Sequence, residues 1–334
     1  MAFAKYYIRD YTELYAYLNE SLKRIKPRVG EPLNELLKRK LAFSYEVILK
    51  ELERVYAVLS EVNSSGSFYR ELFKAYVGED PHALAQLVRR RIQLAKEVYR
   101  EFAGELNEVS GTRGKNYAEL FRGNIGRLLS LYKRINRKVV LVKVFLKEVS
   151  KMPDVRGDYV VVIAGLPQVG KSTILSKLTS AKPEIGTYPF TTKTLIAGHI
   201  SVEPYGRIVL IDSPGVLDSP IEEKNIIERK AVLAVKHLAD HMLYVFAADR
   251  AFYYTLDEQV KVYYALRAIL GDKPTSVVVN KVDTVDEIYL REVLNAVKGA
   301  TSTSPIPVSA VTGLNLDKLR DALIGYFMGR SQRR

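Results

Sequence analysis

The sequence predicts an all-α helical bundle followed by an α/β domain whose sheet is mostly parallel. Apolar residues recur at helical spacing throughout the first half of the chain, whereas the second half alternates short β-rich runs with helical stretches. The change falls at residues 151–158, where Pro153 and Gly157 interrupt the pattern. A chain of 334 residues is long enough for two hydrophobic cores. We therefore expect domains at 1–157 and 158–334.

The first half contains three apolar seams with steps of three and four residues, the spacing that places one apolar stripe along each helix. Turn-forming residues separate the seams and fold the chain back, so we expect an antiparallel bundle rather than one extended coiled coil. The seams are Leu41, Tyr45, Ile48, Leu52, Val55, Leu59 and Val62; Leu84, Val88, Ala95, Val98, Phe102, Leu106 and Val109; and Phe121, Ile125, Leu128, Tyr132, Ile135, Val139, Val142, Leu146 and Val149. The breaks lie at 27–30, 64–67, 78–81 and 111–114.

The second half alternates strands and helices, which predicts a sheet with helices on both faces. Only a tight EPYG turn separates the runs 194–202 and 207–212, so this pair forms a hairpin and gives the parallel sheet one antiparallel strand. The predicted strands are 159–165, 194–202, 207–212, 242–248, 276–280 and 305–310. The predicted helices are 171–180, 223–238, 256–270, 285–298 and 315–327.

The composition is that of a soluble globular protein, with 47% hydrophobic and 27% charged residues. No apolar run is long enough to span a membrane, and the N-terminus lacks the features of a secretory signal, so we expect a cytoplasmic protein. The absence of cysteine excludes disulfides and thiolate metal sites. His237 and His241 lie four residues apart, but no third ligand lies nearby, so we expect ordinary structural roles for both.

Residues 165–172 (GLPQVGKS) follow a predicted strand and open a predicted helix, the context of a phosphate-binding loop. The backbone N–H groups of such a loop cradle phosphate oxygens, Lys171 supplies positive charge to the β- and γ-phosphates, and the Ser172 hydroxyl binds Mg²⁺. ATPases and small-molecule kinases share this loop, so it indicates phosphate binding only. The residues expected to line it are Gly165, Leu166, Pro167, Gln168, Val169, Gly170, Lys171, Ser172 and Thr173.

The run Asn280-Lys281-Val282-Asp283 directly follows a predicted strand. It indicates which base the nucleotide carries. The Asp283 carboxylate can accept hydrogen bonds from both N1–H and the 2-amino group of guanine, which adenine cannot offer. We expect Asn280 to brace the loop and Lys281 to lie along the plane of the base. Ser309 and Ala310 end the last predicted strand, where a backbone N–H can reach the guanine oxygen.

Two further stretches predict contacts with the γ-phosphate. Asp212, at the end of a strand, would bind Mg²⁺ through water, and the N–H of Gly215 would contact the γ-phosphate. In the run YPFTTK we expect Phe190 beside the nucleotide and either Thr191 or Thr192 as an Mg²⁺ ligand in the GTP state. Together these stretches predict that the second half is a P-loop GTPase domain that binds GTP or GDP with Mg²⁺.

The motifs resemble the NOG (nucleolar GTP-binding protein) family, in the Obg-related branch of the translation-factor class of GTPases. The matching stretches are GLPQVGKST, KPEIGTYPFTTK, IDSPGVLD, YTLDEQ (254–259) and NKVD, of which YPFTTK is the most specific. In the family's motif the second threonine is the Mg²⁺ ligand, so the resemblance implies that Ser172, Thr192 and Asp212 hold the metal. Lys171, Thr192 and Gly215 are then the expected catalytic residues.

The resemblance also implies an N-terminal helical domain and a role in the assembly of the large ribosomal subunit. Eukaryotic members carry a long C-terminal extension, whereas this sequence ends at Arg334, which implies an archaeal, minimal member. Val216 occupies the position at which Ras-like proteins have a water-orienting glutamine, so we expect slow hydrolysis. Related GTPases that use K⁺ often have Asn where this chain has Gln168, whose longer amide could still reach a cation.

Positive charge is concentrated in the first half, which has 30 Lys and Arg against 19 Asp and Glu; residues 158–334 have 21 against 19. Residues 120–147 contain eight basic residues and no acidic ones, and we expect these charges to point outward. RNA phosphates are the favoured partner, ahead of an acidic protein face or a membrane surface; DNA is not expected. The candidate RNA contacts are Arg122, Arg127, Lys133, Arg134, Arg137, Lys138, Lys143 and Lys147.

These observations lead to two hypotheses. In the first, the chain is a slow GTPase that acts as a timing switch on the assembling large ribosomal subunit and contacts rRNA through its basic helical domain. In the second, it is a regulatory module that senses the ratio of GTP to GDP, binds a protein partner and hydrolyses almost no GTP.

Overall fold

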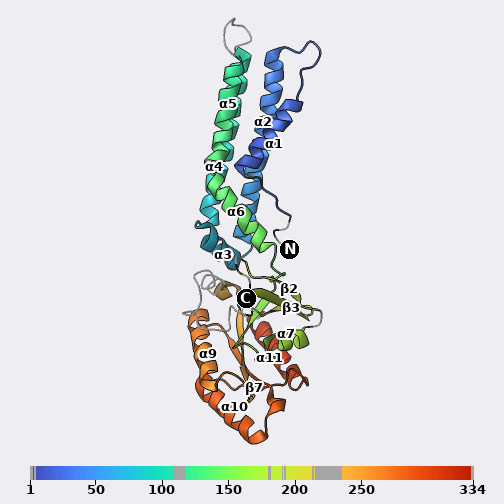
Figure 1. Cartoon of the computed structure of the whole chain (residues 1–334), viewed down its shortest axis with the longest axis vertical. Coiled ribbons are helices and arrows are strands. Elements are labelled where there is room, and N and C mark those ends of the chain that lie inside the picture. Colours follow the sequence, from blue (N-terminus) through green and yellow to red (C-terminus); the bar gives the residue numbers. More distant parts are fainter. Residues whose placement is uncertain are drawn as a thin grey trace. The chain divides into compact units, whose positions relative to one another are not determined.

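The computed structural model describes residues 3, 5–108, 117–179, 182–189, 191, 193–212, 214 and 235–331. The chain forms two compact units, Ala2–Ser150 and Lys151–Arg334. The first is helical, and the second is an α/β domain with a mixed sheet (Figure 1). The predicted fold class is therefore confirmed.

Long helices dominate the helical unit, and their order is α1 (Tyr11–Arg24), α2 (Leu33–Ser64), α3 (Ser67–Val77), α4 (Pro81–Glu108), α5 (Tyr117–Lys133) and α6 (Asn136–Val149). Helices α2, α4 and α5 pack against one another, and α3 packs against α6. The predicted breaks near residues 64–67 and 78–81 coincide with Gly66 and Gly78, both at positive φ, where a residue without Cβ is unstrained. The predicted break at 111–114 lies outside the described residues.

Most of the described residues of the predicted seams lie in the core of this unit, with one correction. Residues such as Ile48, Leu52 and Phe102 are fully buried. The third seam, however, runs along two helices instead of one, because α5 ends at Lys133 and α6 begins at Asn136. At this bend the side-chain oxygen of Asn136 accepts a hydrogen bond of 2.7 Å from the Tyr11 N–H, a long-range contact that no local pattern predicts.

A buried carboxylate on α2 fastens the segment before α1 to the bundle. Glu51 is 1% exposed and accepts from the N–H of Arg9 at 2.7 Å and from its guanidinium at 3.0 Å. Arg54 pairs with the same carboxylate at 2.9 Å. The carbonyl of Arg9 in turn accepts from the buried Tyr132 hydroxyl. A buried charge needs such partners, so the N-terminal segment is part of the folded unit.

The second unit is built on a seven-stranded sheet in the order β2-β3-β4-β1-β5-β6-β7. Only β3 runs against its neighbours in this sheet, as predicted, and its hairpin with β4 closes where Val202 faces Gly206. The strands are β1 (Tyr159–Ala164), β2 (Glu184–Thr187), β3 (Thr194–Val202), β4 (Gly206–Asp212), β5 (His241–Ala247), β6 (Thr275–Asn280) and β7 (Ile306–Pro307).

Helices cover both faces of this sheet. α7 and α11 contact each other on one face, and α9 and α10 lie on the other (Figure 1). Their bounds are α7 (Lys171–Leu178), α9 (Leu256–Leu270), α10 (Glu287–Thr301) and α11 (Leu316–Ser331). The predicted helix 223–238 lies mostly outside the described residues. Within the described part of the chain, no helix combines the length and apolar content needed to cross a membrane.

Two strands differ from the prediction. Sequence analysis missed β2, which is a four-residue edge strand without an alternating pattern and which is recruited by pairing with β3. The predicted strand 305–310 shortens to Ile306–Pro307, because Pro305 and Pro307 have no N–H to donate to a ladder. Even so, the Val308 N–H continues the contact with β6 by donating to the carbonyl of Val279 at 2.8 Å.

Candidate nucleotide-binding site

The predicted phosphate loop connects β1 to α7 at the carboxyl edge of the sheet. It depends on glycine at both ends: Gly165 has φ 141° and Gly170 has φ 98°. A Cβ at Gly165 would lie 2.4 Å from the carbonyl oxygen of Val245, and one at Gly170 would lie 2.2 Å from the side-chain nitrogen of Asn280. Backbone shape and close packing therefore both exclude side chains at these two positions.

The Lys171 ammonium lies against this loop. Lys171 is 6% exposed, and its Nζ donates to the carbonyl oxygens of Gly165 and Leu166, each at 2.9 Å. The ammonium of this lysine, the first residue of α7, therefore contacts the backbone at the start of the loop that precedes the helix. The positive end of the helix and the ammonium face the same volume, which suits a polyanion such as a phosphate chain.

The predicted metal ligands Ser172 and Asp212 come together, although they are 40 residues apart in the chain. The Ser172 hydroxyl donates to a carboxylate oxygen of Asp212, and Asp212 is fully buried at the end of β4. A hydroxyl and a carboxylate are hard oxygen donors of the type that Mg²⁺ prefers. The residues present therefore fit a magnesium ion.

Asn280 connects three of the loops that the sequence assigned to the nucleotide. Its side-chain N–H donates to the carbonyl of Val169 at 2.8 Å, and its side-chain oxygen accepts from the N–H of Ala310 at 2.9 Å. Asn280 is itself 2% exposed at the end of β6. Asn280 thus ties the phosphate loop to the loop after β7 by two buried hydrogen bonds.

The base-reading residues themselves follow β6 directly. Lys281 adopts the left-handed conformation, with φ 64° and ψ 32°, and Asp283 is exposed in the short 3-10 helix that follows. Ser309 is fully buried, and its hydroxyl accepts from the Thr312 N–H at 3.1 Å. Asp283 is therefore open to a ligand, whereas the Ser309 side chain shapes the loop after β7, in which the N–H of Ala310 is already donated to Asn280.

The predicted switch residues are described only in part. Thr191 lies in a tight turn in which its hydroxyl donates to the carbonyl of Tyr188 at 2.9 Å and accepts from the Lys193 N–H at 3.1 Å. Thr191 is thus engaged in holding the turn. Phe190, Thr192 and Gly215 lie outside the described residues, so their assignments stay predictions.

Three residues that the sequence did not single out join this edge of the sheet. Asp249 follows β5 and pairs with Lys281 at 3.4 Å, and the Lys281 ammonium lies 5.0 Å from the centre of the Phe252 ring. Gln259, in the run YTLDEQ, uses its amide to bind both the N–H and the carbonyl of Ala247. A signal was present for Gln259, since its run matched the family, but not for the other two.

Comparison with known proteins identifies the family. Residues 160–281 match the family described as 50S ribosome-binding GTPase. The uncharacterized protein MJ1408 of Methanocaldococcus jannaschii is 32% identical over 242 residues, which cover 72% of this chain and 67% of that one. The nucleolar GTP-binding protein 1 of Drosophila melanogaster is 29% identical over 262 residues, covering 78% of this chain and 40% of that protein. The chain belongs to the NOG family of GTPases.

The resemblance predicted from the motifs is therefore confirmed. The alignment with MJ1408 covers 72% of this chain, which is more than the second unit alone, so the similarity extends into the helical half. The chain spans about 40% of the length of the curated nucleolar proteins it matches. Among solved structures, a putative nucleolar GTP-binding protein 1 from Plasmodium falciparum is 20% identical with a TM-score of 0.45, over 55% of this chain and 92% of that one.

The basic residues of the helical unit divide into two groups. Six of the eight RNA-contact candidates are exposed, as expected, while Lys138 and Lys143 are half-buried. Arg127 pairs with Glu101, Lys138 with Glu79, and Lys143 with Asp10 and Glu13, so the protein already uses these three charges. The remaining five have no carboxylate partner in the described part of the chain: Arg122, Lys133, Arg134, Arg137 and Lys147.

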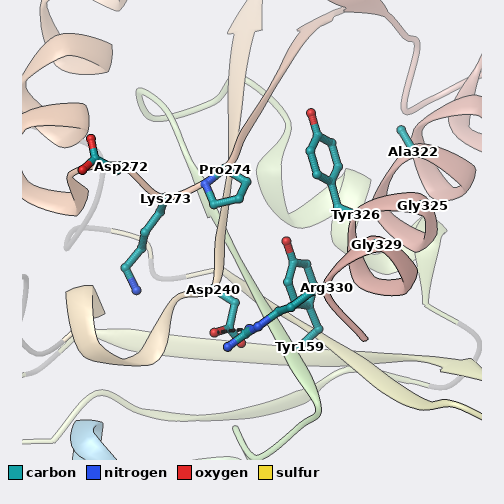
Figure 2. Close-up of a pocket in the computed structure, with 10 residues that line it drawn as sticks. All are labelled: Tyr159, Asp240, Asp272, Lys273, Pro274, Ala322, Gly325, Tyr326, Gly329 and Arg330. Carbon is teal, nitrogen blue, oxygen red and sulfur yellow. Dashed lines mark ion pairs between the residues drawn. The ribbon is translucent and has the colours of Figure 1, made fainter. Parts of the chain in front are cut away.

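A cavity of about 830 Å³ opens at the other edge of the sheet, where β1, β5 and β6 begin (Figure 2). Small residues of α11, among them Gly325 and Gly329, form one wall. Its two cationic side chains are engaged by the protein, because Arg330 pairs with Asp240 at 2.5 Å and Lys273 donates to the carbonyl of Ala239. This cavity therefore offers little unused positive charge, and the nucleotide loops lie at the opposite edge.

His241, which contacts the cavity residues Tyr159 and Tyr326, is buried between two hydroxyl groups. Its ring nitrogens lie 3.0 Å from the Tyr159 hydroxyl and 3.0 Å from the Ser276 hydroxyl. Burial lowers the pKa of His241 from 6.5 to about 4. His237, by contrast, is exposed.

We expect His241 to make folding stability depend on pH. The folded chain keeps this imidazole neutral down to about pH 4, whereas the unfolded chain protonates it as the pH falls through 6.5. The free energy of unfolding is therefore unaffected by this imidazole above pH 6.5. It falls as the pH drops from 6.5 to 4, by about 3 kcal/mol in all, because the unfolded chain binds the proton that the folded chain does not bind. Urea unfolding of the NOG chain between pH 7.5 and 4.5 measures this loss. His241→Gln should flatten the dependence and His237→Gln should retain it; equal slopes for the two variants would contradict the assignment.

Proposed function

We propose that this chain binds GTP and GDP, hydrolyses GTP slowly, and acts as a switch during assembly of the large ribosomal subunit. The observation that carries the nucleotide part is the position of Asn280, whose two buried hydrogen bonds join the phosphate loop to the loop after β7. Loops expected to bind phosphate and base are thereby held as one site. The matched family and the nucleolar relatives support guanine nucleotides and a ribosomal partner.

In the proposed site each group has a separate task. Lys171 stabilises negative charge on the β- and γ-phosphates, and the N–H groups at the start of α7 bind their oxygens. Ser172 and Asp212, with Thr192, would hold Mg²⁺, which neutralises charge that develops during phosphoryl transfer. Asp283 reads the guanine edge, and Gly215 contacts the γ-phosphate.

Slow hydrolysis follows from the residue after the DSPG run. Val216 is apolar and cannot orient an attacking water molecule, so the intrinsic rate should be low until a partner supplies that function. Low intrinsic turnover suits a timing switch, because the GTP state persists until assembly reaches a defined point. Gln168, at the tip of the phosphate loop with φ 65°, is the residue whose amide could hold a K⁺ ion there.

The helical unit supplies the proposed contact with ribosomal RNA. The five exposed basic residues without a carboxylate partner can neutralise phosphates without first breaking an ion pair. The described residues show no RNA-reading motif, so contact would depend on the shape and charge of the RNA backbone. The expected location is the cytoplasm.

The test is sedimentation of the purified chain with large ribosomal subunits, in GDP and in a non-hydrolysable GTP analogue, across a salt series. We expect co-sedimentation that is stronger with the analogue and falls with salt by about 0.7 log units per log unit for each phosphate contact on single strands. The double variant Arg134→Gln/Arg137→Gln should bind less and show a shallower slope. Arg291→Gln, an exposed charge on α10, is the control and should leave binding unchanged. No binding in either state would overturn the ribosomal part of the proposal.

A regulatory module that binds a protein partner is the second candidate function. Helix α6 exposes apolar side chains between its lysines: Val140 is 39%, Leu141 37% and Val144 45% exposed. Such residues favour a protein contact over an RNA backbone. This reading predicts binding that is insensitive to salt and to removal of rRNA, together with GTP turnover that stays negligible on the ribosome.

A further inference from the structure

The base-reading lysine is held from two sides by the loop that follows β5. The Lys281 Nζ lies 3.4 Å from a carboxylate oxygen of Asp249 and 5.0 Å from the centre of the Phe252 ring. Both charged side chains are about three-quarters buried, with exposed fractions of 27% and 26%. Burial reduces the screening of this ion pair by water, and an aromatic face adds to the attraction of the ammonium.

The Asp249 carboxylate is held in place by its own turn, independently of the lysine. Its other oxygen accepts from the Ala251 N–H at 2.9 Å, and its carbonyl accepts from the Phe252 N–H at 3.1 Å. These bonds form a tight turn that presents the second carboxylate oxygen and the Phe252 ring on the same side, toward Lys281. Two hydrogen bonds within the turn thus define where the ammonium is held.

The turn is anchored to the rest of the site through α9. The Gln259 side chain is 2% exposed; it accepts from the Ala247 N–H at 2.8 Å and donates to the Ala247 carbonyl at 3.3 Å. The next residue, Ala248, donates its N–H to the carbonyl of Asn280 at 3.0 Å. The ends of β5 and β6 are therefore locked side by side, which sets the distance between Asp249 and Lys281.

We propose that Asp249 and Phe252 are positioning residues for Lys281: they hold its ammonium at the edge of the site so that its aliphatic stem lies along the guanine ring. A lysine side chain is flexible and loses rotamer freedom when a ligand fixes it. The ion pair and the ring remove that freedom before the nucleotide binds, so less affinity is lost on binding. This inference rests on the proposed function, because it assumes that guanine nucleotides occupy the site.

Asp249→Asn keeps one side-chain oxygen, which can still accept from the Ala251 N–H, but removes the negative charge that holds Lys281. We expect the affinities for GDP and GTP to fall by the same factor, about fivefold, since the base is common to both nucleotides. Phe252→Leu, which keeps apolar bulk and removes the ring, should weaken both by about threefold. Asp257→Asn, an exposed charge in the first turn of α9, is the matched control and should bind as the wild type does.

A double-mutant cycle separates positioning from a general effect on folding. In a Lys281→Met background, Asp249→Asn should cause no further loss, because the group it acts on is gone. The measurement is nucleotide affinity by titration calorimetry of the full chain, with thermal unfolding without nucleotide as the check on folding. An unchanged affinity for both Asp249→Asn and Phe252→Leu, or an equal loss from Asp249→Asn in both backgrounds, would overturn this inference alone. Failure of the wild type to bind guanine nucleotides would overturn the proposed function together with it.

Discussion

Replacement of Lys171 by alanine should abolish measurable binding of both GTP and GDP. The ammonium is buried against the phosphate loop, where it lies within hydrogen-bond distance of two loop carbonyls. Charge-assisted hydrogen bonds to a phosphate chain in such a place contribute about 3 kcal/mol, so we expect affinity to fall by more than about 100-fold. Titration of the full chain with each nucleotide measures this loss.

The matched control for this variant is Lys177→Ala, which removes an exposed lysine from the same helix. It should bind both nucleotides as tightly as the wild type. The Lys171→Ala chain should also retain the helical content of the wild type, because the alanine is a good helix former at the start of α7. Retention of micromolar affinity for GTP by Lys171→Ala would show that the loop does not bind phosphate as proposed.

Replacement of Asp283 by asparagine should change the base that the site prefers. A carboxylate accepts hydrogen bonds from both N1–H and the 2-amino group of guanine, whereas an amide presents one donor and one acceptor. The amide donor opposes the guanine amino group but matches the 2-oxo group of xanthine. We expect GDP affinity to fall by about 100-fold and xanthosine diphosphate to become the preferred ligand.

Two features make this test specific. Asp283 is exposed in its 3-10 turn, so an isosteric amide should leave the fold intact. Asp286→Asn is a suitable neighbour control, because Asp286 caps α10 by accepting from the Tyr289 N–H at 2.9 Å, and asparagine caps as well as aspartate. It should keep the guanine preference. An unchanged preference in Asp283→Asn would rule out the base-reading role.

The loops that carry the proposed chemistry could be predicted because their requirements are local. Gly165 and Gly170 lie at positive φ and close to other backbone or side-chain atoms, and Lys171 follows at the first turn of a helix. These demands fall on consecutive residues, so they leave a readable motif. The alternation of strands and helices is equally local, and it predicted the sheet and its one antiparallel strand.

The pattern of charge along the sequence was a poorer guide, because it says nothing about which helices and turns will pack beside it. The acid-free stretch 120–147 predicted eight outward charges. Lys143, however, lies beside Asp10 and Glu13, which are 133 and 130 residues earlier in the chain. Arg127 also pairs with a carboxylate on another helix, Glu101 of α4, and Lys138 pairs with Glu79 in the turn between α3 and α4. An ion pair is decided by packing, so only the folded bundle shows which charges remain for a partner.

The sequence by itself thus determined the family, the order of the elements and the residues proposed to read phosphate and base, because each of these depends on short runs of neighbouring residues. Only the tertiary structure decided how the runs are joined. Asn280 reaches a carbonyl 111 residues away in the phosphate loop, and Asp249 meets Lys281 across two neighbouring strand ends. Such contacts arise from the register of parallel strands, which brings their carboxyl ends to one edge and leaves no mark in the local sequence.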